Sequence, residues 1–154
     1  NGWVHGEVGT AQLGDSGFRA RAAFDFGHNL DRDWQLTLGA DTGLRGWDPD
    51  TFDGTSRAVV NLEWRARLTG EVLHLGILGM SVFADAGRTW APRVGPGTEG
   101  WRADAGLGLH VELTRASIAR VVRVEVGFPL HGEGPVLLVS ASPVFYQARR
   151  RWGR

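Results

Sequence analysis

The chain contains no cysteine and no lysine, and only one tyrosine and one methionine among its 154 residues. Without cysteine it can form neither a disulfide nor a thiolate metal site. Its 17 basic residues balance 17 acidic ones, so nothing in the charge implies an electrostatic grip on nucleic acid. No run of about 18 apolar residues occurs, which excludes a transmembrane helix.

Signals for helices and for export are also scarce. No segment sustains an apolar stripe at positions i, i+3, i+4 and i+7, and glycine, of which there are 23, interrupts every long apolar stretch. The chain opens at Asn1 with sheet-like sequence and without the pattern of a secretory signal peptide. We therefore expect it to be the downstream part of a longer precursor.

What the sequence does have is an alternation of apolar and polar residues with a period of two. The alternation is unbroken from Trp101 to Leu113, where Asp104 and Glu112 fall on the polar side. It recurs over residues 18–27, 34–41, 57–68, 75–87 and 122–130, and more weakly over 3–13 and 136–145. These segments predict about eight strands, each near the 9–11 residues that a tilted strand needs to cross a bilayer.

The segments between the predicted strands alternate between short turns and longer loops, as in a membrane barrel. Trp3, Trp34, Trp90 and Trp101 lie at strand ends, where an interfacial aromatic girdle belongs. A period of two alone does not separate a membrane barrel from a soluble β-sandwich. The long strands and the glycine-rich, charged polar faces favour an all-β, antiparallel transmembrane barrel.

One tetrapeptide, Leu44-Arg45-Gly46-Trp47, follows the predicted strand 34–41 and precedes a loop rich in Asp, Pro and Gly. Two later strands carry Glu63 and Asp85 on their polar faces. Both acids could therefore meet Arg45 inside one closed sheet. Arginine suits this pairing because its planar guanidinium engages carboxylates bidentately and keeps its proton.

In order and spacing, these signals resemble the C-terminal barrel of the BamA/TamA-type bacterial surface antigen family, within the outer-membrane-protein-85 superfamily. That family has a Val/Leu-Arg-Gly-Tyr/Phe motif in a long loop, followed by five strands. Here Trp47 replaces the usual Tyr or Phe, and about five strands follow: 56–69, 75–88, 101–113, 119–130 and 136–145. Glu63 stands where the family has a strand acid, and Phe83-Ala84-Asp85-Ala86-Gly87 matches its Phe-x-Asp-x-Gly motif. Residues 126–130 look like its penultimate-strand ending, and 139–145 look like its terminal strand, closing on the aromatic Phe145.

The resemblance implies that residues 1–146 are the C-terminal part of a larger, about 16-stranded barrel, followed by a basic tail at 147–154. It implies a place in the bacterial outer membrane, in contact with its lipids, with periplasmic domains upstream. The motif loop would fold into the lumen and be locked by the acids of the inner wall. Such a barrel would assemble or insert outer-membrane proteins, or translocate proteins, with unfolded barrel or secreted proteins as clients. The resemblance implies no enzyme, cofactor or metal.

Other interpretations stay open. A passive porin-like barrel or a soluble β-sandwich binding module would share the alternation. A barrel enzyme built on Asp85, Asp104 and His110 lacks an accompanying serine motif. The Asp-rich loop from Asp48 is not an EF-hand, because its twelfth position is Val59 rather than Glu. The five histidines have no metal-ligand spacing.

Overall fold

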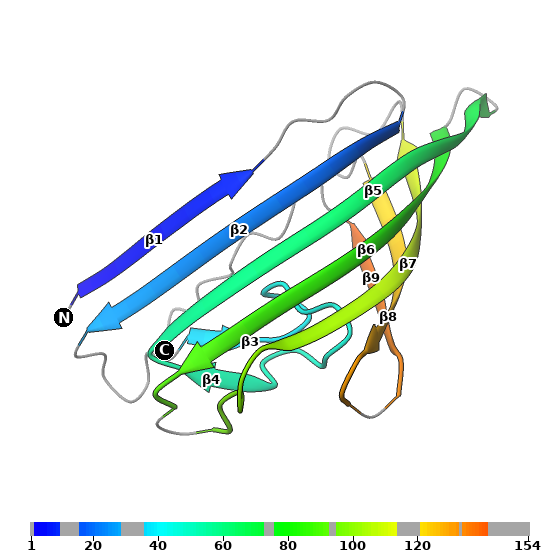
Figure 1. The fold of residues 1–154 in the computed structure, drawn as a ribbon. Coiled ribbons are helices and arrows are strands. Elements are labelled where there is room, and N and C mark those ends of the chain that lie inside the picture. Colours follow the sequence, from blue (N-terminus) through cyan, green and yellow to red (C-terminus); the bar gives the residue numbers. More distant parts are fainter. Residues whose placement is uncertain are drawn as a thin grey trace.

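The computed structural model describes residues 2–9, 16–28, 36–72, 76–92, 95–113, 121–132 and 134–141. These residues form strands, turns and loops, and no helix. Seven antiparallel strands make one sheet (Figure 1): β1 (Gly2–Gly9), β2 (Ser16–His28), β5 (Ser56–Val72), β6 (Gly76–Trp90), β7 (Arg102–Leu113), β8 (Val121–Pro129) and β9 (Val136–Ala141), in the spatial order β1-β2-β5-β6-β7-β8-β9. The predicted all-β, antiparallel fold is confirmed.

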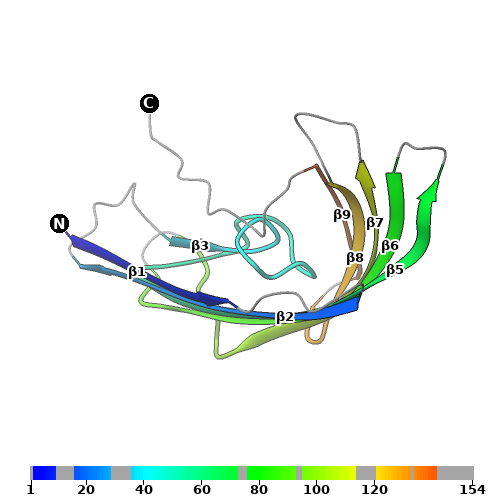
Figure 2. The same ribbon diagram turned by 90° about the horizontal axis from the view of Figure 1, so that it is seen from above.

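The sheet is strongly curved, and one stretch of chain lies inside the curve. Figure 2 shows the strands forming an open trough, with residues 36–54 on its concave side. Two short strands within this stretch, β3 (Leu36–Leu38) and β4 (Phe52–Gly54), pair only with each other. Because β2 pairs directly with β5, residues 36–54 are an excursion between neighbouring strands. We call them the inner loop.

The two faces of the sheet have opposite chemistry. Successive side chains of a strand point to opposite faces, and here the apolar set points away from the inner loop. Twelve large apolar side chains of this convex face are between 40% and 70% exposed: Phe18, Phe24, Phe26, Leu62, Trp64, Val82, Leu107, Leu109, Val124, Phe128, Leu137 and Val139. The concave face buries charged and polar residues instead, among them Asp25, Glu63, Asp85, Asp104 and Glu125.

The predicted strand 34–41 is wrong as a strand of the main sheet. Of the described part of this segment, residues 36–41, only Leu36–Leu38 forms a strand, and it pairs with β4 rather than with a neighbour in the sheet. The chain turns directly afterwards, because the amides of Thr42, Gly43 and Leu44 all donate to the carbonyl of Gly39. The Gly39 amide in turn donates to the hydroxyl of Thr42 at 2.8 Å. A side chain that hydrogen-bonds to nearby backbone groups competes in this way with the backbone hydrogen bonds between the strands of a sheet.

The remaining predicted strands match β1, β2 and β5–β9 to within a few residues wherever the structure describes them. Five strands of the main sheet follow the tetrapeptide, as expected. The connections at one end of the sheet are long, including the inner loop and residues 91–101. At this end Trp90 and Trp101 make an edge-to-face contact, with ring centroids 6.5 Å apart. Phe145 and the basic tail 147–154 lie outside the described residues.

Candidate functional site

A small apolar core anchors the inner loop on the concave face. Leu44 is fully buried and packs with Leu38, Phe52 and Val59, of which Val59 belongs to the wall strand β5. Trp47 packs against this cluster, and its ring meets that of Phe52 edge to face at 5.0 Å. The first and last residues of the tetrapeptide therefore fasten the loop, and the two residues between them are held against the wall.

The backbone before the arginine needs a glycine. Gly43 has a φ of +126°, which side-chain-bearing residues rarely adopt, and a Cβ there would stand 2.6 Å from a methyl group of Val59. The Asn61 side chain donates to the Gly43 carbonyl at 2.7 Å. This close approach brings the next residues of the loop down onto β5 and β6.

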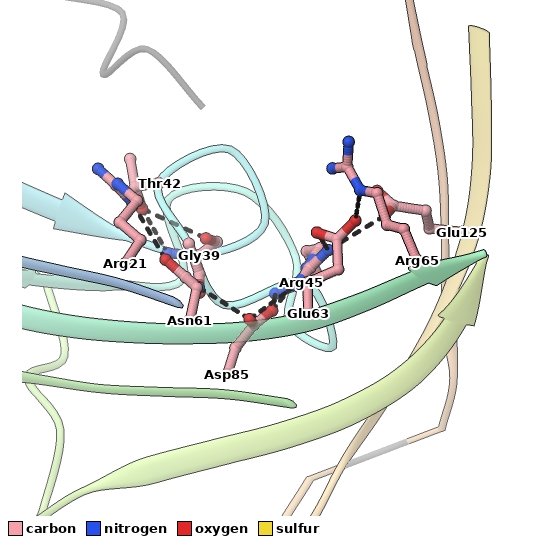
Figure 3. Close-up of polar contacts among 10 residues, drawn as sticks. Arg21, Gly39, Thr42, Arg45, Asn61, Glu63, Arg65, Asp85 and Glu125 are labelled. Atoms are coloured by element: carbon pink, nitrogen blue, oxygen red, sulfur yellow. Dashed lines mark hydrogen bonds and ion pairs between the residues drawn. The ribbon is translucent and has the colours of Figure 1, made fainter. Parts of the chain in front are cut away.

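Arg45 is the centre of the site and has no exposed surface. Its guanidinium binds Asp85 bidentately: Nε donates to Oδ2 at 2.7 Å, and Nη2 donates to Oδ1 at 2.9 Å. Its Nη1 donates to Glu63 at 3.0 Å and to Glu125 at 3.1 Å (Figure 3). One loop side chain thus joins β5, β6 and β8. We call Arg45, Glu63, Asp85 and Glu125 the Arg45 cluster.

A second layer of contacts fixes the acids of this cluster. Asn61 donates to Asp85 at 2.8 Å and accepts from Arg21 of β2 at 3.1 Å. Arg65 donates from its Nε to Glu63. The guanidinium carbon of Arg45 lies 3.6 Å from the ring centroid of Phe83, within the range of a cation–π contact. Asp85 and Glu63 are therefore held by residues of the wall as well as by Arg45.

The burial of the cluster determines how much its ion pairs contribute to the free energy of unfolding. Exposed ion pairs contribute about 0–1 kcal/mol, because solvent screens them. Removing one partner of a buried pair costs about 3–5 kcal/mol, because the other charge is left uncompensated. Arg45, Glu63 and Asp85 belong to the second class. The pair of Arg67 and Glu112, at 3.7 Å and nearly half exposed, belongs to the first.

The residue after the arginine must also be small. A Cβ added to Gly46 would stand 2.5 Å from the Cβ of Asp104 and 3.0 Å from the backbone nitrogen of Pro129. The wall leaves no space for a side chain at this point. The Arg-Gly sequence therefore combines a long side chain that reaches the acids with a backbone that touches β7 and β8.

A separate ion pair fastens the start of the inner loop. Arg57 of β5 donates to Asp25 of β2 at 2.6 Å and to the carbonyl of Thr37 in β3 at 2.5 Å. His5 of β1 completes this group through a 2.7 Å contact with Asp25. The inner loop is thus attached to the wall at both its beginning and its middle.

The structure brings together most of the residues that the sequence singled out. Leu44, Arg45, Gly46 and Trp47 lie against the wall, and Arg45 contacts both predicted acids, Glu63 and Asp85. Sequence reasoning missed Glu125, although it occupies a polar position in the alternation of 122–130. It also missed Asn61 and Phe83. Nothing in the sequence indicates the curvature that brings β8 within reach of a residue bound to β5.

The described residues form neither the catalytic group nor the metal site that the sequence left open. Asp104 and His110 are six residues apart on β7, about 20 Å at the rise of a strand, so Asp85, Asp104 and His110 form no catalytic group. Within the described ranges, no three His, Asp or Glu side chains gather as a metal site. In the same part of the chain no helix has the length and apolarity to cross a bilayer.

Comparison with known proteins adds no assignment. No family model matches the chain, and neither the curated proteins nor the solved structures include a match. The features that bear on function are therefore the inner loop, the Arg45 cluster and the two faces of the sheet.

Proposed function

We propose that this chain is part of an outer-membrane β-barrel that assembles or inserts outer-membrane proteins, or translocates proteins across that membrane. In this proposal the convex face contacts lipid and the inner loop lies in the lumen, held by the Arg45 cluster. The seven strands would continue into a larger barrel of about 16 strands. No catalytic step, metal or cofactor is part of the proposal.

The observation that carries the proposal is the position of Arg45. It is buried with its acids on the face opposite to the exposed apolar side chains. A soluble protein rarely exposes a continuous apolar surface larger than a few hundred Å², whereas a lipid-facing barrel requires one. The tetrapeptide therefore occupies the side of the wall that a membrane barrel keeps away from lipid.

Two other functions fit less well. A soluble β-sandwich would cover the apolar face with a second sheet, whereas Leu107 and Trp64 on the convex face are 57% and 42% exposed. A passive porin-like barrel would share the apolar exterior. It would have no need for a loop that is fastened by three carboxylates and fills part of the interior, which favours the assembly or translocation role.

The edge of the sheet at β9 suggests how a client would be handled. Among the described residues β9 has six residues and pairs only with β8. A strand edge with unpaired backbone groups recruits other β-structure. We propose that a client strand is templated at or near this edge, while the Arg45 cluster keeps the wall from β5 to β8 in shape.

The test uses the full-length protein refolded in detergent and then reconstituted in lipid vesicles. Heat-modifiable migration in gels, followed by increased folding of an added urea-unfolded outer-membrane protein, is the expected result. Arg45→Ala should lower the client-folding rate at least tenfold. Arg67→Ala removes an exposed arginine that lies 3.7 Å from Glu112 and should leave the rate unchanged, because exposed ion pairs contribute little.

Two results would contradict the proposal. Failure of the wild-type protein to enter vesicles would reject the membrane barrel. Equal client folding by wild type and Arg45→Ala, with both inserted, would reject a role of the inner loop in assembly. Passive permeation of small solutes with no effect on clients would instead identify a porin.

A further inference from the structure

One cross-strand row on the concave face contains two acids side by side. Asn61, Asp85, Asp104 and Pro129 are register partners on β5, β6, β7 and β8. Directly opposed residues of antiparallel strands have Cβ atoms about 4.5–5.5 Å apart, so like charges there repel. Asp85 and Asp104 are both almost completely buried, so bulk solvent screens the repulsion only weakly.

The two acids are not equivalent. Both oxygens of Asp85 accept hydrogen bonds from the Arg45 guanidinium, and one also accepts from Asn61. Asp104 is 1% exposed, and among the described residues neither of its carboxylate oxygens has a partner at full hydrogen-bond geometry, the backbone of Gly46 being the nearest donor group. A buried carboxylate with no partner is strongly disfavoured, and such a group takes up a proton instead.

Among the described residues, no cation is bonded to Asp104. From β6 it faces Asp85, and from the inner loop it faces Gly46 and Arg45, whose guanidinium is directed at the other acids. From β8 its register partner is Pro129. On its own strand Arg102 is two residues away, and its guanidinium lies 5.9 Å from the ring centroids of both Trp47 and Phe52.

We propose that Asp104 is a proton-binding site, in which its buried carboxyl group keeps one proton beside its cross-strand partner Asp85. Two carboxylates that share a site behave in this way, because the pair cannot easily carry two charges. When the pH rises, the proton passes to solvent and a second negative charge appears beneath Gly46. The carboxylate then requires hydration, which separates the inner loop from β7. This inference rests on the proposed function only in that the proton on Asp104 would regulate the same inner loop.

The first test reads the proton directly in the full-length protein folded in detergent. Infrared spectra at neutral pH should contain the carbonyl stretch of a protonated carboxyl group, and this band should disappear as the pH is raised. Asp104→Asn should lack the band. Asp25→Asn is the matched control, because Asp25 is equally buried but bonded to Arg57 and His5; the band should persist in it.

The second test follows thermal unfolding against pH. The wild type should lose stability as the pH rises from about 4, where an unfolded aspartate releases its proton, through neutral, because folding in this range takes up a proton that the unfolded state no longer holds. The dependence should level off once the folded state also releases its proton. Asp104→Asn should unfold at or above the wild-type temperature at neutral pH and lose this dependence. Asp25→Asn should unfold at a lower temperature throughout.

Absence of the band in the wild type, or its persistence in Asp104→Asn, would overturn the inference. So would an Asp104→Asn protein as destabilised as Asp25→Asn. These measurements are made in detergent without a client. A failure here leaves vesicle insertion and client folding untouched, and failure of those assays leaves this proton site standing.

Discussion

The convex face of the sheet exposes leucine while the concave face buries glutamate. On the convex face, Leu107 of β7 is 57% exposed. On the concave face, Glu63 of β5 is 1% exposed. In a protein folded in water the burial of apolar surface is the main driving force, so this distribution is inverted. The difference between the faces shows that the apolar side chains of this sheet lie opposite the inner loop, which supports the proposal that the convex face contacts lipid.

A large effect is expected from placing a charge on the convex face. Leu107→Arg should destabilise the protein in vesicles by about 2–4 kcal/mol, because the guanidinium would lie in the hydrocarbon region. Leu130→Arg is the control, since Leu130 is just as exposed but lies in the turn after β8. The measurement is urea-induced unfolding in vesicles. Equal, small effects of the two changes would place both residues in water.

Much of this comparison could be predicted from the sequence. The alternation of residues 57–68 and 101–113 already assigns Leu107 and Glu63 to opposite faces, because the period of a strand is two. Periodicity cannot say which face is buried, since that depends on the surrounding medium. The partnership of Arg45 with Glu63 and Asp85 followed from residue types and from the family resemblance.

The inner loop shows where sequence reasoning failed. Residues 34–41 alternate like a strand, but the turn at Gly39 and the Thr42 hydroxyl redirect the chain into the trough. Glu125 escaped notice because its contact with Arg45 spans eighty residues. That contact depends on the curvature of four adjacent strands, which no local pattern encodes.

The largest effect is expected from an exchange of charge on the concave face. Arg45→Glu alone should cost about 3–5 kcal/mol, because it removes the cation and adds a fourth acid to a buried cluster. Combining it with Asp85→Arg should recover part of this loss, since an ion pair across the same two positions is restored. Chemical denaturation of the single and double variants gives the coupling free energy. Purely additive losses would mean that the two residues do not act as a pair.

A smaller effect is expected where the loop backbone touches the wall. Gly46→Ala should cost about 1–3 kcal/mol, because its Cβ would overlap Asp104 and the wall backbone must shift. Gly70→Ala in β5 is the control, since a Cβ there meets nothing within 4 Å. Thermal unfolding of both variants provides the comparison. A Gly46→Ala protein as stable as Gly70→Ala would show that the inner loop does not press on β7 in solution.

In the proposed barrel the convex side of β7 faces lipid and its concave side faces the lumen. Because the chain has no cysteine, single cysteines at positions 107, 109 and 110 of the reconstituted protein can each carry a spin label. Lipid-dissolved oxygen should relax the labels at 107 and 109 strongly, and the label at 110, on the concave face, weakly. A water-soluble nickel complex that relaxes the labels at 107 and 109 as strongly as an exposed turn would contradict the account.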